Sequence, residues 1–402
     1  MSEAERYASE LAHTLHAVLS RMSVEQKVGQ LIMIDIIYDS SGNPVTKVND
    51  DVRKTLREVQ PGGIILFGQN LKTVEQVRTL TADLQEESTV PLFLSTDQEG
   101  GRISRLTMAP DIPATDVPSE HVIGRTGDPR LARDAGRVLA RELRALGMNM
   151  DMAPVADLDT NPGNQIVGDR AYGSDPVETG KMVAAAVRGI QSEDVCAVVK
   201  HFPGHGDTHG DSHNGRVSVP HDLARLSRVE FVPFRAGIDA GVDFVMTGHI
   251  AAPRVTGNNL PATLSPVLLG DVLRKQLKFD GIVITDDLSM KSLPPYSPGR
   301  LAVAIVQAGA DMLLGPTDPR EAAAALVSAV HDGTISGQRL DESVRRILRV
   351  KIERGIFVPP EADAWLTAQL ATRRAAPVAP SEIGSPENRQ IVRAILDAKP
   401  AE

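Results

Sequence analysis

The stretch from Lys200 to Asn214 reads KHFPGHGDTHGDSHN and holds more reactive side chains than any comparable segment of the chain. Proline removes a backbone donor and glycine costs backbone entropy, so this composition favours a loop over a helix or strand. The apolar run at 195–199 directly precedes it and predicts a buried strand. The reactive side chains of this loop are His201, His205, Asp207, His209, Asp211 and His213.

Three kinds of chemistry fit this loop. His205, His209 and His213 could hold zinc as loop ligands. The same histidines could serve only to cap backbone groups. In Asp211-Ser212-His213, a carboxylate two residues from an imidazole could hold one ring N–H, fix the tautomer and raise the basicity of the other nitrogen. The loop alone leaves the three possibilities open.

Composition excludes several classes of protein. The 402 residues carry a net charge of -9, which gives no basic surface for nucleic acid, and 3% aromatic residues, which leaves few stacking platforms. The single cysteine, Cys196, lies in an apolar run and predicts a small buried side chain. No run approaches the ~20 apolar residues of a membrane helix. The charged first twenty residues do not resemble a signal peptide, so we expect no membrane contact and a cytoplasmic protein.

Apolar runs alternate with helical patterns along most of the chain. The runs predict eight strands, at 28–37, 62–67, 91–95, 148–155, 195–199, 242–246, 281–285 and 310–314. Helices are predicted at 1–27, 52–59, 74–84, 131–146, 182–190, 226–238, 267–277, 301–308, 322–330 and 340–352. Eight strand–helix units in one run predict a closed (β/α)8 TIM barrel, since a doubly wound open sheet rarely needs so many.

The domain organisation follows from this count. Residues 1–355 are predicted to form one catalytic TIM-barrel domain. Residues 356–402 are rich in proline and predict a short C-terminal extension with a helix near 387–396.

Polar side chains gather where the predicted strands end, which is where a barrel holds its reactive groups. Carboxylates accept hydrogen bonds from hydroxyls, while arginine and lysine donate to oxygen, so the set suits a neutral, oxygen-rich ligand. Asp287 could be a helix cap, whereas Asp286 directly follows an apolar strand, where an acid is costly unless paired or used. The strand-end residues are Asp97, Arg105, Asp157, Arg170, Lys200, His201, His249 and Asp286.

These motifs together resemble the bacterial β-N-acetylhexosaminidases of glycoside hydrolase family 3. The segments that carry the resemblance are KHFPGHGDTHGDSH, TDQEGGRISRL, NMDMAPVADLDTNP, VGDRAYGSD and GIVITDDLSM, in the family's order. They extend over residues 24–355, and the C-terminal tail is not covered. Gly248 is a mild departure, because the family usually has alanine before His249.

The resemblance implies a role for particular residues. Asp286 matches the catalytic nucleophile, His213 the acid/base and Asp211 its dyad partner. Asp97, Arg105, Arg170, Lys200 and His201 match sugar-binding positions. Two groups flanking a glycosidic bond in this way give a retaining double displacement.

The expected function is therefore that of a retaining exo-β-N-acetylglucosaminidase, a hydrolase that removes terminal β-linked N-acetylglucosamine. The resemblance and the cytoplasmic prediction favour muropeptide fragments from peptidoglycan recycling as substrate. We expect no cofactor, no metal and no partner besides this small carbohydrate, and the sequence leaves the oligomeric state open. The alternatives are a β-glucosidase or glycoside phosphorylase of the same family, and a zinc-dependent hydrolase built on the histidine-rich loop.

Overall fold

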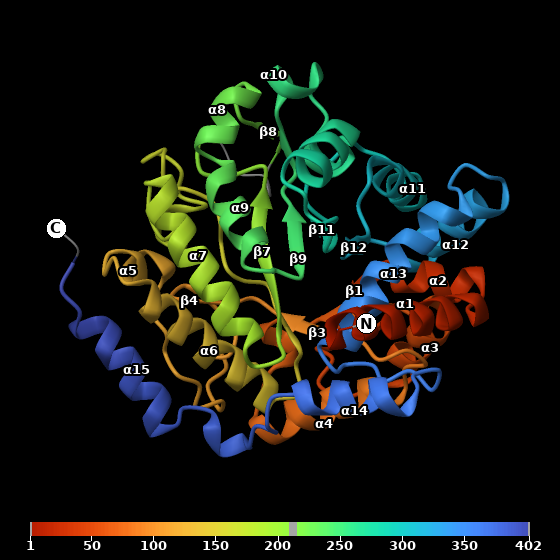
Figure 1. Ribbon diagram of the computed structural model, residues 1–402, viewed down its shortest axis with the longest axis horizontal. Helices are drawn as coiled ribbons and strands as arrows, with labels where there is room; N and C mark the ends of the chain where they lie inside the picture. Colours follow the sequence, from red (N-terminus) through yellow and green to blue (C-terminus); the bar gives the residue numbers. More distant parts are fainter. Residues whose placement is uncertain (1, 209–214, 401–402) are drawn as a thin grey trace.

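Eight parallel strands close into a barrel with helices around it (Figure 1). The computed structural model describes residues 2–208 and 215–400. Strands neighbour one another in the order β1-β12-β11-β9-β7-β6-β3-β2, so each barrel strand pairs with the barrel strands before and after it in the chain. The barrel strands are β1 (Ile32–Asp35), β2 (Gly63–Ile65), β3 (Phe93–Thr96), β6 (Met150–Asp151), β7 (Cys196–Phe202), β9 (Phe244–Thr247), β11 (Ile282–Asp287) and β12 (Met312–Leu314). The predicted (β/α)8 barrel is confirmed.

Helices cover the outside of this barrel. The longer ones are α1 (Glu3–Arg21), α2 (Val24–Gln30), α3 (Asp50–Val59), α4 (Val74–Glu86), α6 (Pro129–Ala145), α7 (Pro176–Gln191), α9 (Phe231–Asp239), η4 (Val267–Gln276), α11 (Pro298–Ala308), α12 (Pro319–His331), α13 (Gly337–Glu353), α14 (Ala364–Arg373) and α15 (Pro386–Asp397). The short ones include α5 (Glu120–Gly124), α8 (Leu223–Arg228) and α10 (Pro253–Thr256).

Local sequence explains these elements. Helix α6 begins at an Asp128 cap with Pro129 in its first turn, where a missing N–H costs nothing, and it buries one apolar face that includes Val138 and Leu143. All seven residues of β7 are buried, as expected of a parallel strand between neighbouring strands and covering helices.

Several predicted boundaries are wrong. The strand expected at 28–37 is shorter, because a capping box of Ser23 and Gln26 starts α2, which continues to Gln30. The predicted helix at 1–27 is thus two helices. The predicted helix at 226–238 is broken between α8 and α9, and the strand expected at 148–155 is regular only over β6. Apolar content predicted burial correctly at these places, but not the element type or length.

The C-terminal residues pack on the barrel's helical layer. Helix α14, which no sequence pattern predicted, contacts α1, and α15 lies against α5 and α6 at the edge of the molecule (Figure 1). The side chain of Asn388 donates to Glu142 of α6 at 3.1 Å. These contacts fit a C-terminal extension beginning near residue 356, and that boundary remains a prediction.

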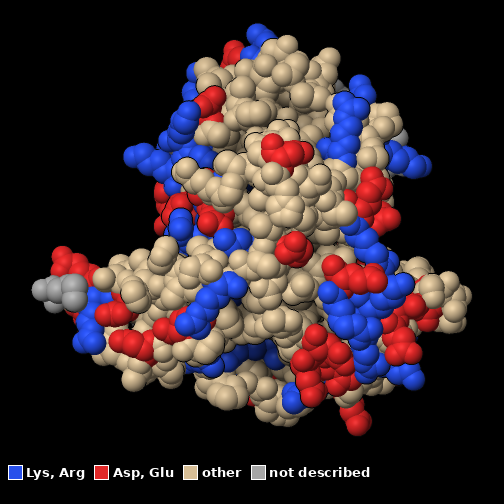
Figure 2. Space-filling model, turned by 90° about the vertical axis from the view of Figure 1, so that its right-hand side faces the viewer, with Lys and Arg blue, Asp and Glu red and all other residues tan. Residues whose placement is uncertain are grey.

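Acidic and basic side chains are interspersed on the face shown in Figure 2. This mixed pattern agrees with the modest net charge of -9. Within residues 2–208 and 215–400, no helix is both long enough and apolar enough to cross a membrane.

Candidate active site

A cavity of about 320 Å³ opens at the carboxyl ends of the barrel strands. Phe67, Met246 and Met290 give it apolar walls. Charged side chains from four different strand ends face the same space, as expected of a barrel enzyme. The charged or ionisable residues that line it are Asp97, Glu99, Arg105, Arg170, Lys200, His201, Asp286 and Asp287.

The loop after β3 supplies the first group. β4 (Gln98–Gly100) and β5 (Ile103–Ser104) form a small antiparallel hairpin, which returns Arg105 to Asp97. Nη2 of Arg105 donates to Oδ2 of Asp97 at 3.0 Å. Gly100, at φ 90°, could not carry a side chain here, because a Cβ would lie 2.7 Å from the carbonyl oxygen of Pro118.

Glu99 is the centre of a buried ion-pair network. Arg170 holds its carboxylate with two parallel bonds of 2.8 Å, and Nζ of Lys200 lies 2.6 Å from Oε1. Lys200 also lies 3.6 Å from Asp97. Burial alone would raise the pKa of Glu99, but the Lys200 and Arg170 charges outweigh it and hold that pKa well below its usual range. The network thus stays ionised and fixes two cations beside the cavity.

His201 is oriented by Asp157. Its Nδ1 lies 2.7 Å from Oδ2 of Asp157, whose other oxygen accepts the backbone N–H groups of His201 and His205. Burial would raise the pKa of Asp157, yet the imidazoles of His201 and His205 bring it below the usual value. Because a carboxylate accepts, Nδ1 carries the proton, and Nε2 of His201 remains for the cavity, 3.5 Å from Nη2 of Arg170.

The two acids at the end of β11 lie in different environments. Oδ1 of Asp286 accepts the N–H of Asp287 at 2.8 Å, and Oδ1 of Asp287 accepts the N–H of Ser289 at 2.8 Å. Burial opposes ionisation of Asp286, but nearby His201 and His249, with that N–H, leave its pKa below the usual value. Burial raises the pKa of Asp287, and the Asp286 charge adds to the rise. Asp286 is therefore the more readily ionised of the two acids.

His249 contacts this strand end and is not among the residues that line the cavity. Its Nε2 lies 3.0 Å from the carbonyl oxygen of Asp287, and its Nδ1 lies 2.8 Å from Oγ1 of Thr263. Burial lowers the pKa of His249, and because a carbonyl oxygen only accepts, Nε2 donates to the carbonyl of Asp287. The ring therefore positions β11 rather than facing the cavity.

Six residues predicted from strand ends do surround the cavity: Asp97, Arg105, Arg170, Lys200, His201 and Asp286. Asp211 and His213 lie outside the described residues, as does His209. His205 is buried away from the cavity lining, with Nδ1 2.7 Å from Oγ1 of Thr208. The predicted dyad and the predicted three-histidine zinc set therefore remain predictions.

Two residues of the site had no role assigned from sequence. Glu99 lies two positions after Asp97, and this is the one sequence feature that could have indicated a place in the site. Its ion-pair partners, Arg170 and Lys200, are 71 and 101 residues away in the chain. The sequence indicates Asp157 only as a strand-end acid. Its use in orienting His201 depends on the neighbouring β7, which sequence spacing does not show.

Comparison with known proteins identifies the class to which this barrel and cavity belong. The pattern of the glycosyl hydrolase family 3 N-terminal domain matches residues 23–350. The chain belongs to glycosyl hydrolase family 3.

Three individual proteins illustrate how similar this chain is to members of the family. Beta-hexosaminidase A of Pseudoalteromonas piscicida is 29% identical over 92% of this chain, and the match spans 65% of that protein's length. A glycoside hydrolase family 3 beta-N-acetylglucosaminidase from Paenibacillus is 40% identical and superposes with a TM-score of 0.82, covering 93% of this chain and 68% of that one. A beta-glucoside phosphorylase bound to 2FGlc is 26% identical, with a TM-score of 0.81 over 99% of this chain and 67% of that one.

Proposed function

We propose that this protein is a retaining exo-β-N-acetylglucosaminidase in which Asp286 is the nucleophile. The observation that carries the proposal is the ionised Asp286 carboxylate in the cavity wall, surrounded by donors and acceptors suited to sugar hydroxyls. The names of the bacterial relatives favour N-acetylglucosamine as the sugar. A muropeptide fragment of peptidoglycan, met in the cytoplasm, is the natural substrate that the family resemblance favours.

The proposed reaction has two displacements. An oxygen of Asp286 bonds to the anomeric carbon as the bond to the leaving oxygen breaks, and His213 gives that oxygen a proton. A water molecule then attacks the same carbon, and His213 takes a proton from that water. The bond between the carbon and Asp286 breaks, which releases the carboxylate. Asp211 is proposed to orient the His213 ring. An ordinary imidazole pKa near 6.5 suits a group that both gives and takes a proton at neutral pH.

The fixed charges are proposed to bind the sugar. Asp97 accepts from hydroxyls, while Arg105, Lys200 and Arg170 donate to hydroxyl or carbonyl oxygens. Because Glu99 already neutralises and orients Lys200 and Arg170, and Asp157 orients the neighbouring His201, little reorganisation is needed when the sugar enters.

Nitrophenyl glycosides assayed with and without phosphate test the substrate and the acceptor. We expect a much higher kcat/KM for the N-acetylglucosaminide than for the glucoside, and free sugar as product whether or not phosphate is present. Phosphorolysis is the second candidate, favoured by the similarity to the phosphorylase. A phosphate-dependent rate with sugar phosphate as product would support it, and equal rates on both glycosides would contradict the N-acetylglucosaminidase proposal.

A leaving-group series tests His213. His213→Ala should lose about 10²–10⁴ in rate with poor leaving groups, which need a proton, and far less with nitrophenolate. His209→Ala is the matched control, because it removes an imidazole from the same segment. If the loop histidines held zinc instead, both variants would lose metal and slow all substrates alike.

A further inference from the structure

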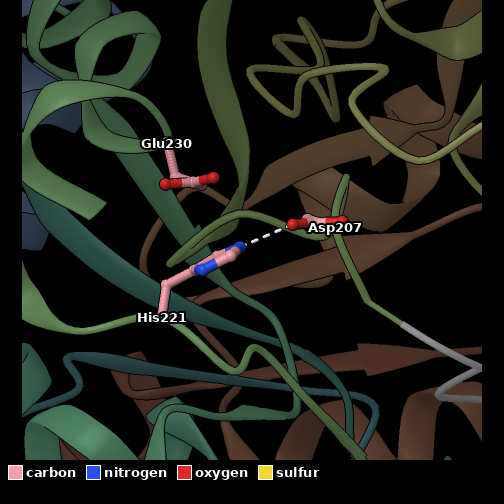
Figure 3. Close-up of side chains that lie close together, drawn as sticks. All are labelled: Asp207, His221 and Glu230. Carbon is pink, nitrogen blue, oxygen red and sulfur yellow. Dashed lines mark hydrogen bonds and ion pairs between the residues drawn. The ribbon is translucent and has the colours of Figure 1, made fainter. Parts of the chain in front are cut away.

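A second group of ionisable side chains lies outside the cavity lining, where the loop after β7 meets the helices that follow it. Asp207 lies in that loop, His221 lies between β8 (Val217–Ser218) and α8, and Glu230 lies between α8 and α9. One oxygen or nitrogen from each lies within 4.8 Å of the other two. Figure 3 shows the His221 ring beside the Asp207 carboxylate, with the Glu230 carboxylate above them. None of the three lines the active-site cavity.

Glu230 supplies an independent sign that something is bound here. Its side chain is buried, with 3% of its surface exposed. Oε1 accepts from Nη2 of Arg225 at 3.1 Å, but Oε2 has no hydrogen-bond partner among the described residues. A buried carboxylate oxygen without a partner is destabilising, so a hydrogen-bond donor or a cation at this oxygen would stabilise the fold.

We infer that Asp207, His221 and Glu230 bind a divalent transition-metal ion, and that zinc is the ion they fit. One imidazole nitrogen with two carboxylate oxygens is a ligand set that zinc accepts, whereas calcium and magnesium prefer oxygen alone. Three protein ligands leave the fourth tetrahedral position to water. Arg225 holds the other oxygen of Glu230, so it orients this ligand without occupying the metal position.

The geometry needs a small adjustment to take the ion. Nε2 of His221 and Oδ2 of Asp207 lie 2.5 Å apart, whereas two ligands of one tetrahedral zinc lie ~3.4 Å apart for bonds of ~2.0–2.1 Å. The pair must therefore open by less than about 1 Å. Asp207 and His221 have side chains 25% and 20% exposed, which leaves a path for a hydrated ion from solvent.

Two of the proposed ligands flank the segment that contains the proposed acid/base. Asp207 and His221 lie on either side of segment 209–214 in the chain, so one ion bound to both fixes the separation of that segment's flanks. This consequence rests on the proposed function, because the segment contains the proposed acid/base His213 and its partner Asp211. Metal removal should then lower kcat/KM more for poor leaving groups than for nitrophenolate. The binding itself is independent of any activity.

Titration of the chelator-treated full chain with zinc, followed by calorimetry, tests the site. We expect one equivalent bound with a Kd of about 1 μM or tighter. His221→Ala and Glu230→Gln should each weaken binding by at least about 100-fold, because losing a ligand should cost at least as much as losing an outer-shell partner, which costs about 10–100-fold. Glu230→Gln keeps the side-chain shape and an acceptor for Arg225, so it separates loss of a ligand from loss of packing. His331→Ala, which removes an exposed imidazole at the end of α12, should leave binding unchanged.

Two results would overturn the proposal. One is the absence of stoichiometric zinc binding to the wild-type chain. The other is zinc that binds His221→Ala and Glu230→Gln normally but is lost in His209→Ala or His213→Ala, because the ion would then lie on the histidine-rich segment. Circular dichroism of each variant confirms that it is folded. Failure of the glycosidase assay leaves these binding results unaffected, so the two proposals fail separately.

Discussion

The two ends of the barrel both bury carboxylates among cations, but they use the arrangement differently. At the carboxyl end, Glu99 is held by Arg170 and Lys200 beside a cavity of about 320 Å³. At the amino end, Asp311 precedes β12 and is fully buried beneath α13. Its ion-pair partners are Arg274, Arg339 and Arg346, and it also accepts from Ser343 and the N–H of Val283.

The contrast shows which observation marks a functional site. Burial would raise the pKa of Asp311 as it would that of Glu99, and in both places neighbouring cations outweigh burial and lower it. A lowered pKa therefore does not separate the two ends. The two ends differ in whether a ligand can reach the cations. At the carboxyl end the cations border a cavity, whereas at the amino end they surround Asp311, which already has ion-pair and hydrogen-bond partners. We therefore expect variants at the two ends to affect different measurements.

Asp286→Asn should have the largest effect. It removes the proposed nucleophilic charge while keeping an oxygen to accept the N–H of Asp287. We expect kcat/KM to fall by roughly 10⁴-fold or more, with an unchanged unfolding midpoint in denaturant. A fluorinated sugar that traps the covalent intermediate should label Asp286 in the wild type. Labelling of Asp287 or Asp97, or a larger loss in Asp287→Asn, would contradict the assignment.

Asp311→Ala should reverse this pattern. Removing the carboxylate leaves three arginines facing a buried space, which should cost about 3–5 kcal/mol of the free energy of unfolding. The rate per folded molecule should stay near that of the wild type. Asp280→Ala is the control, because Asp280 also pairs with Arg346 but is 73% exposed, and its loss should cost under about 1 kcal/mol. Equal losses of stability would show that burial does not govern the amino-end cluster.

The sequence predicted the barrel because buried parallel strands are continuous apolar runs, and each of the eight runs overlaps a barrel strand. It could not place the start of β1, since Val28 belongs to a helix and is as buried as the strand residues that follow. Strand-end positions predicted Asp97, Lys200, His201 and Asp286 together, because parallel strands in a barrel end at one face.

Long-range partners explain what the sequence could not assign. The roles of Glu99 and Asp157 come from side chains on other strands and loops, and no spacing within one segment encodes them. The partners of Glu230 are likewise not evident from the sequence. It follows α8 as an ordinary helix-flanking acid in the sequence, and only the fold brings it to Asp207 and His221.

Glu99→Gln should have an intermediate effect, on activity and its pH dependence. Burial alone would lower the pKa of Lys200, and the Glu99 charge, with that of Asp97, raises it above its usual value. Without the Glu99 charge, the pKa of Lys200 falls, so the alkaline limb of kcat/KM should move to lower pH. Loosening of Lys200 and Arg170 should lower kcat/KM by about 10²-fold.

Asp169→Asn is the control for Glu99→Gln, because it neutralises an acid beside Arg170 that pairs instead with the exposed Arg102. It should leave both the rate and the alkaline limb unchanged. An alkaline limb that does not move in Glu99→Gln would contradict a role for this charge in keeping Lys200 protonated.

Lys351 should affect stability but not activity, and the sign of its effect follows from the direction of its pKa shift. On α13, it is fully buried, with Nζ 2.7 Å from Oε1 of Gln30 and 5.0 Å from the centre of the Phe93 ring. Burial lowers its pKa to about 7, whereas an unfolded lysine has a pKa near 10.4. Between these values the unfolded chain binds one more proton than the folded one, so this residue makes stability rise with pH by about 1.4 kcal/mol per unit.

Denaturant unfolding of wild type and Lys351→Met at several pH values measures the difference. The wild type should gain on the variant as pH rises from 7 to 10, whereas Lys275→Met, at a 77% exposed lysine on η4, should show no such trend. A constant difference between wild type and Lys351→Met would mean that Lys351 stays protonated when buried, and that the amino end can hold a cation without an acid beside it.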